Sequence, residues 1–191
     1  MSLIYRHDDG EMIKMKHMTI NGIGGKVHYW ISRPNNNPKG ALVFTHGLTA
    51  NHTMYERQVK YFKNDYVVIT WDVPLHGLSI PYKEFSYEIT ARDLNSILLQ
   101  ESIGKVCLIG MSMGGYPSQM FAYLYPEKVQ CFVGIDTTPF RTEYYSKSDL
   151  WWLSKVKTMA EWFTDKTLRK SMAKSVAVTD YSYNKMIEML K

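Results

Sequence analysis

A serine lies in a glycine-rich segment directly after a short, largely apolar run in the middle of the chain. The run Lys105–Ile109 has the composition of a buried β-strand, and Gly110-Met-Ser-Met-Gly114 follows it at once. A G-x-S-x-G segment between a strand and a helix predicts a turn so tight that small residues must flank the serine. The pattern therefore requires a strand, an exposed serine hydroxyl and a helix in immediate succession.

The remaining apolar patterns alternate between strands and helices. We expect strands at 12–20, 26–32, 41–45, 66–71, 105–109 and 129–135, and helices at 54–63, 86–101 and 113–124. The glycines of Asn21–Gly25 are expected to supply the positive φ of a hairpin turn between the first two strands. This alternation predicts an α/β fold with a mostly parallel, doubly wound sheet over residues 1–137. Residues 138–191 form a second predicted region, with a helical pattern rich in Lys, Met and aromatic residues and no evident strand.

Composition excludes several classes of protein. The chain has 191 residues and a mass of 22.2 kDa, enough for a sizeable core. Its formal net charge of +5 is spread along the sequence, so we expect no nucleic-acid partner. No stretch reaches the roughly 18 apolar residues that span a bilayer, and the N-terminus is too polar for a signal peptide. We therefore predict a cytoplasmic protein without stable membrane insertion.

The two cysteines and the absence of metal-binding patterns bear on cofactors. Cys107 and Cys131 each lie inside an apolar run, which favours buried free thiols in a reducing compartment over a disulfide or a metal pair. Neither His-Glu-x-x-His nor Cys-x-x-Cys occurs in the sequence. We expect no metal site and no cofactor.

Four polar residues come directly after predicted strands, namely His46, Asp72, Ser112 and Asp136. Parallel strands present their carboxyl ends at one edge of the sheet, where ligands of such folds bind. These side chains should therefore meet at that edge. We expect Asp72 to hold its loop by accepting hydrogen bonds from backbone N–H groups.

Three segments together resemble the α/β-hydrolase superfamily. They are Phe44-Thr-His-Gly-Leu48, Trp71-Asp-Val-Pro-Leu-His-Gly-Leu-Ser79 and Gly110-Met-Ser-Met-Gly-Gly115, each following a predicted strand. The resemblance implies that Ser112 attacks an acyl carbon and forms an acyl-enzyme that water hydrolyses.

The resemblance also implies roles for residues around the serine. The backbone N–H groups of Leu48 and Met113 would form the oxyanion hole. Residues expected to support this arrangement are His46, Gly47, Gly110 and Gly114. In this family the general base comes from a late loop, so the resemblance assigns His46 a structural role.

The acid and the base are harder to place. In α/β-hydrolases they follow the serine, but all six histidines of this chain precede Ser112. Asp136 is a candidate acid, with capping of its own loop as the alternative. We expect either that a C-terminal segment of about 60–80 residues, an analogy from family size, is missing, or that the chain self-associates across the edge of strand 129–135.

The resemblance also implies that residues 138–191 form a helical cap. This cap would cover the serine and contribute Trp151 and Trp152 to a substrate pocket, unless these residues only form the cap's own core. The function implied is a serine hydrolase that cleaves a carboxylic ester or related acyl bond of a small molecule. The alternative is a catalytically inactive relative that binds a small apolar ligand or a partner.

Overall fold

The computed structural model describes residues 2–6, 12–148, 150–151, 155, 171, 174 and 177–189. The chain divides into two compact units, Met1–Thr138 and Pro139–Lys191. Each unit is described by itself.

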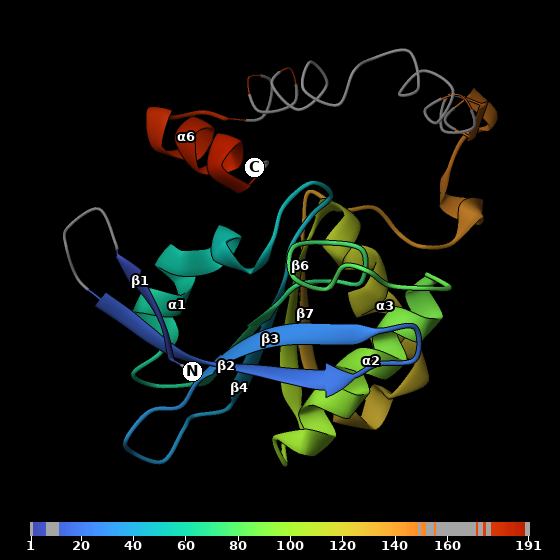
Figure 1. Ribbon diagram of the computed structural model, residues 1–191. Coiled ribbons are helices and arrows are strands. Elements are labelled where there is room, and N and C mark those ends of the chain that lie inside the picture. The colour runs from blue at the N-terminus through green and yellow to red at the C-terminus, as the bar shows by residue number, and fades with distance from the viewer. Residues whose placement is uncertain are drawn as a thin grey trace. The chain divides into compact units, whose positions relative to one another are not determined.

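The first unit is built on a seven-stranded sheet in the order β1-β2-β3-β5-β4-β6-β7 (Figure 1). Its strands are β1 (Ser2–Arg6), β2 (Met12–Asn21), β3 (Lys26–Ser32), β4 (Ala41–Thr45), β5 (Val67–Trp71), β6 (Val106–Met111) and β7 (Val129–Ile135). The first three strands form antiparallel pairs, and β5, β4, β6 and β7 form a parallel block. The predicted α/β fold class is confirmed, whereas β1 was not predicted.

Helices cover both faces of the parallel block, as in a doubly wound sheet. The helices are η1 (His52–Tyr55), α1 (Glu56–Phe62), α2 (Tyr87–Gln100), η2 (Ser112–Gly114), α3 (Gly115–Leu124) and η3 (Pro126–Lys128). On one face, α2 and α3 pack against Val43, Ile69 and Leu108. On the other face, η1 and α1 pack against Leu42 and Phe44. Successive residues of one strand thus enter opposite cores.

Burial decreases from the middle of the sheet toward β7. All residues of β4 and β5 are buried, and those of β6 alternate between buried and half-buried. In β7 only Val129 is half-buried, and every other residue is exposed. Among the described strands, β7 pairs on one side only, so its other edge carries unpaired backbone groups.

The glycines in the hairpin between β2 and β3 have a different role from the one predicted. Gly22 donates its N–H to Gly25 O at 2.8 Å, but none of the hairpin's glycines has a positive φ. The prediction of positive φ was wrong. Glycine is needed for space instead, because a Cβ on Gly25 would lie 2.8 Å from Pro81 O, and one on Gly24 would collide with Lys83 O.

The cysteines also differ from expectation. Cys107 and Cys131 are direct neighbours in the β6–β7 ladder, with Cα atoms 4.5 Å apart, and form a disulfide. The prediction of free thiols was wrong. The pairing follows from the register of two strands that lie 24 residues apart in sequence, which a single sequence does not specify.

The second unit contains helical segments in its described parts. These include η4 (Thr142–Tyr144) and α6 (Asp180–Met189), whose start is held by hydrogen bonds between Thr179 and Ser182. Within the described ranges, no helix has the length and apolar character needed to cross a membrane.

Candidate functional site

Ser112 occupies the turn between β6 and α3, which we call the serine turn (Gly110–Gly115). Its φ of 50° lies in the left-handed region, which non-glycine residues rarely adopt. The side chain is exposed and lies at the carboxyl end of the parallel block. Ser112 belongs to neither of the two cores that cover the sheet.

The glycines around Ser112 are required by close backbone packing. A Cβ on Gly110 would lie 2.5 Å from Gly114 O, and a Cβ on Gly114 would collide with the carbonyl oxygens of Thr45 and His46. A larger residue at Gly110 would push the start of α3 away from β6, and one at Gly114 would push it away from the end of β4.

The loop that follows β4 lies beside the serine. A Cβ placed on Gly47 would be 3.5 Å from Ser112 Cβ. The Leu48 side chain is 56% exposed, whereas Met113 is half-buried against the core beneath α2 and α3. The structure thus brings Gly47 close to Ser112 at one edge of the sheet. Leu48 and Met113 follow these two residues directly in the chain.

His46 is fully buried, and both of its ring nitrogens have partners. Nε2 accepts the N–H of Val73 at 3.1 Å, so Nδ1 carries the proton and donates to Gly47 O at 2.8 Å. Burial lowers the pKa of His46 to about 4. A neutral ring with both nitrogens engaged is suited to fixing the loop of Gly47 and unsuited to taking a proton from a serine.

Asp72 holds the loop after β5. Its Oδ1 accepts from the His52 backbone N–H at 2.8 Å and from His52 Nδ1 at 2.7 Å, and its Oδ2 accepts from the Leu78 N–H at 2.7 Å. Burial alone would raise the pKa of Asp72, but the hydrogen bonds from His52 and Leu78 outweigh it and lower that pKa. The predicted capping role of Asp72 is confirmed.

Thr137 is a contact that sequence reasoning missed. Its Oγ1 donates to Ser112 O at 2.8 Å, and its side chain occupies the space that a Cβ on Gly115 would need. The preceding residue, Asp136, is exposed and has a φ of 45°. Asp136 directly follows the last residue of β7, at the same edge of the sheet. Its role as the catalytic acid stays a prediction.

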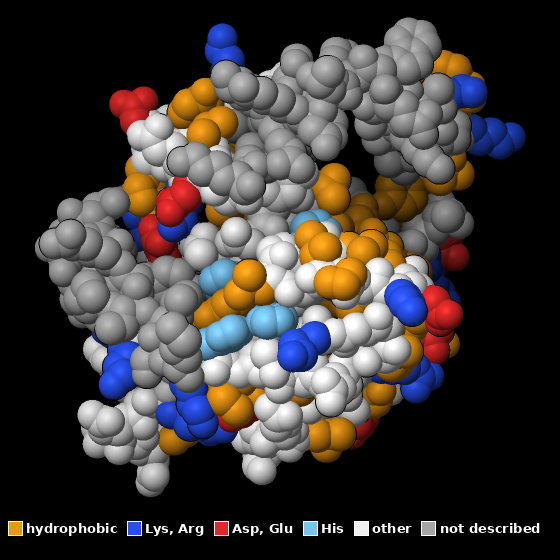
Figure 2. All heavy atoms as spheres, viewed as in Figure 1, with side chains coloured by type: hydrophobic (Ala, Val, Ile, Leu, Met, Phe, Trp, Pro, Cys, Tyr) orange, Lys and Arg blue, Asp and Glu red, His pale blue; other side chains and the backbone are white. Residues whose placement is uncertain are grey.

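The other described histidines have hydrogen-bond partners other than Ser112. His17 Nε2 and His28 Nδ1 are 2.9 Å apart, His52 pairs with Asp72, and His76 Nδ1 lies 3.1 Å from Pro74 O. Figure 2 shows histidine side chains gathered on one face of the molecule. Between residues that the structure describes, no histidine hydrogen bond reaches Ser112. His7 lies outside that part.

The predicted pocket tryptophans lie in the second unit. Trp151 is 55% exposed, and Lys155 Nζ is 5.9 Å from the centre of its ring. Trp152 lies outside the described residues. Within those residues, no group of three or more His, Cys, Asp or Glu side chains could hold a metal ion.

The sequence profile of the family described as "alpha/beta hydrolase fold" matches residues 40–188, which is more than half of the chain. The chain belongs to the α/β-hydrolase fold family. The matched range contains the serine turn, the His46 loop and the Asp72 loop.

Enzymes of several kinds are similar to this family member. The 3-oxoadipate enol-lactonase 2 of Acinetobacter baylyi is 33% identical over 89 residues, covering 46% of this chain and 33% of the relative. The sn-1-specific diacylglycerol lipase of Mus musculus is 33% identical over 104 residues, covering 53% and 34%. The chain spans about a third of the length of these relatives.

Solved structures agree on the fold of this family member. The epoxide hydrolase CorEH superposes with a TM-score of 0.71 at 15% identity, covering 92% of this chain and 68% of that one. A thermophilic esterase from Thermogutta terrifontis superposes with a TM-score of 0.66 at 19% identity, covering 92% and 66%. At these identities the likeness concerns the fold.

Proposed function

We propose that this protein is a serine hydrolase that cleaves a carboxylic ester or related acyl bond through an acyl-enzyme on Ser112. The observation that carries the proposal is the left-handed, exposed serine at the carboxyl edge of the sheet, beside the Gly47–Leu48 loop. We read this turn as a nucleophile elbow. The lactonase and lipase relatives both act on ester bonds by name.

The charge that develops during acyl transfer needs donors already in place. We propose the backbone N–H groups of Leu48, which follows Gly47 in the neighbouring loop, and of Met113, which follows Ser112 in the helical segment. The loss of one such donor typically costs about 2.7–4 kcal/mol of transition-state stabilisation. His46 would serve this hole indirectly, because its Nδ1 holds Gly47 O.

No described histidine forms a hydrogen bond with Ser112, so the general base must come from elsewhere. Our candidate for the acid is Asp136. We propose that further polypeptide pairs with the exposed edge of β7 and brings the histidine to Ser112. That polypeptide would be either additional sequence of the same protein or a second copy of the chain. Unpaired, apolar strand edges are sites where such pairing occurs.

The experiment compares Ser112→Ala with Ser96→Ala, a control on the exposed side of α2. Hydrolysis of p-nitrophenyl esters should be lost in the first variant and unchanged in the second. The catalytically inactive alternative, a binder of a small apolar ligand or partner, predicts that the unaltered protein has no hydrolysis to lose. Hydrolysis that survives Ser112→Ala would contradict our assignment of the nucleophile.

We propose that the second unit acts as a helical cap and that Trp151, with Trp152, contacts the acyl part of the substrate. Trp151 is a large apolar side chain that remains exposed. Trp151→Ala should then reduce kcat/KM for long-chain esters several-fold more than for acetate esters. Tyr144→Ala, at another exposed aromatic residue of the same unit, is the control. Equal losses on short and long esters would remove Trp151 from the substrate site.

We also propose a cytoplasmic location, as expected from the composition. Cell fractionation followed by immunodetection tests it, and recovery outside the cytosolic fraction would contradict it.

A further inference from the structure

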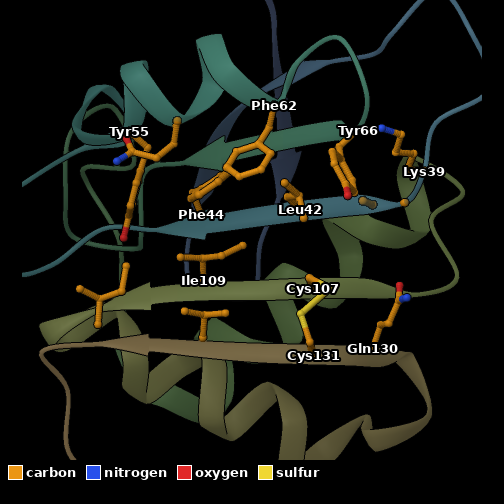
Figure 3. A pocket seen from close by; sticks show the side chains of 15 residues that line it. Lys39, Leu42, Phe44, Tyr55, Phe62, Tyr66, Cys107, Ile109, Gln130 and Cys131 are labelled. Carbon is orange, nitrogen blue, oxygen red and sulfur yellow. A yellow bond between two sulfur atoms is a disulfide. The ribbon is translucent and has the colours of Figure 1, made fainter.

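A groove runs along the strands on the face of the sheet that carries α1. It has a volume of about 450 Å³ and lies between the aromatic side chains of η1 and α1 and the exposed strand β7 (Figure 3). Its floor consists of apolar side chains of β4 and β6, including Leu42, Phe44 and Ile109. Ser112 is not among the residues that line this groove.

The Cys107–Cys131 disulfide forms part of the groove wall. Figure 3 shows its two sulfur atoms bridging β6 and β7, with Lys39 and Gln130 at the same end of the groove. Cys131 is exposed, whereas Cys107 is half-buried. The bond is thus accessible from the groove, mainly from the side of Cys131.

We propose that this disulfide is a thiol-exchange site, opened by a low-molecular-weight thiol that enters the groove. The incoming thiolate attacks the Cys131 sulfur, which forms a mixed disulfide and expels Cys107 as a thiolate that takes up a proton. A second thiol then attacks the mixed disulfide, which releases the oxidised small molecule and leaves two cysteine thiols. The two electrons that reduce the protein come from the two small thiols.

The position of the bond gives its opening a structural consequence. In the described part of the chain, β7 is attached to the sheet only along β6, and the disulfide cross-links these two strands. The segment that follows β7 reaches the serine turn, where Thr137 donates to Ser112 O. Reduction should therefore loosen the edge strand without unfolding the core under α2 and α3, which the disulfide does not touch.

The two sulfur atoms differ in access, and this difference gives a matched pair of variants. Cys107→Ser leaves the exposed Cys131 as a free thiol, and Cys131→Ser leaves the half-buried Cys107. Thiol reactivity follows exposure, so glutathione disulfide should modify Cys107→Ser on the order of tenfold faster than Cys131→Ser. Both variants lose the same bond, so a general loss of stability affects them alike.

The experiment follows the intact mass of the native protein during incubation with reduced glutathione. We expect a single glutathione adduct on Cys131 and then a dithiol form heavier by two hydrogens, while far-ultraviolet circular dichroism stays unchanged. A dithiol that forms only in denaturant would overturn the proposal, and so would equal modification rates in the two variants. The readout is independent of ester hydrolysis, so its failure would leave the proposed function untouched.

Discussion

Ser112 holds a backbone conformation that costs a non-glycine residue of order 1–3 kcal/mol, so its surroundings must stabilise it. The close fit of Gly114 against β4 fixes one side of the turn. On the other side, Thr137 Oγ1 donates to the carbonyl of Ser112 itself. A threonine after the neighbouring strand thus helps to orient the serine without contacting its hydroxyl.

Replacement of Thr137 tests this interpretation at the residue scale. Thr137→Val keeps the shape of the side chain but removes the hydrogen bond to Ser112 O, which is worth about 1 kcal/mol. We expect ester hydrolysis to fall several-fold, through kcat more than through KM. Thr137→Ser, which keeps the hydroxyl, should retain most of the activity. Equal activity in the valine variant and the unaltered protein would show that the bond does not position Ser112.

Residue patterns predicted some of the site and missed the rest for identifiable reasons. The turn at Ser112 could be predicted because its close backbone contacts leave no room for a Cβ at the flanking glycines, and these glycines are visible in the local sequence. The contact of Thr137 with Ser112 spans 25 residues, and its existence depends on the packing of β7 against β6. A single sequence contains no sign of that contact.

At the scale of elements, α2 (Tyr87–Gln100) begins within one residue of the start predicted from the sequence. Ser86 is the N-cap residue, and its hydroxyl accepts the N–H of Ile89 at 3.1 Å. Beyond the cap, the buried face of the helix contributes Leu94, Ile97 and Leu98 to the core. Local capping and burial therefore specify the same helix.

Ser86→Ala should lower the free energy of unfolding by about 1 kcal/mol, because it leaves a helix N–H without its capping partner. Ser86→Asp preserves an accepting oxygen and should stay close to the unaltered protein. Urea denaturation followed by circular dichroism measures both changes. A destabilisation shared by the aspartate variant would point to packing instead of capping.

Strands differ in how well their sequences predict them. β4 and β5 are buried throughout, and apart from Thr45 and Thr70 their residues are all apolar. β1 was missed because Ser2–Arg6 has no alternating pattern of its own and is defined by its backbone pairing with β2. The disulfide was missed for a related reason, because it depends on the register of β6 against β7.

At the scale of the whole molecule, one buried and two half-buried imidazoles connect folding to pH. Burial is the largest cause that lowers the pKa of His17, His28 and His46, with contributions from His52 to His17 and from His17 to His28. The folded protein therefore binds fewer protons than the unfolded chain below pH of about 6.5. Stability is fully present above that pH and is lost as the pH falls toward the folded pKa values.

For His46, with a folded pKa of about 4, the loss between pH 7.5 and pH 5 should be about 2 kcal/mol. Urea denaturation at the two pH values measures it. His46→Gln removes the ionisable ring and should show a smaller difference between the two pH values, even if it is less stable at both. An unchanged difference in this variant would contradict the burial of a neutral His46.

The central claim is that Ser112 is an activated nucleophile, and the most direct measurement is labelling with a fluorophosphonate probe followed by intact mass and peptide mapping. The account predicts one adduct, located on Ser112, retained in Ser96→Ala and absent from Ser112→Ala. Detection of the adduct on a species heavier than 22.2 kDa, or together with a second polypeptide, would also reveal where the base comes from. A folded protein that stays unlabelled although the polypeptide that supplies the base is present, or that is labelled equally in both variants, would contradict the claim.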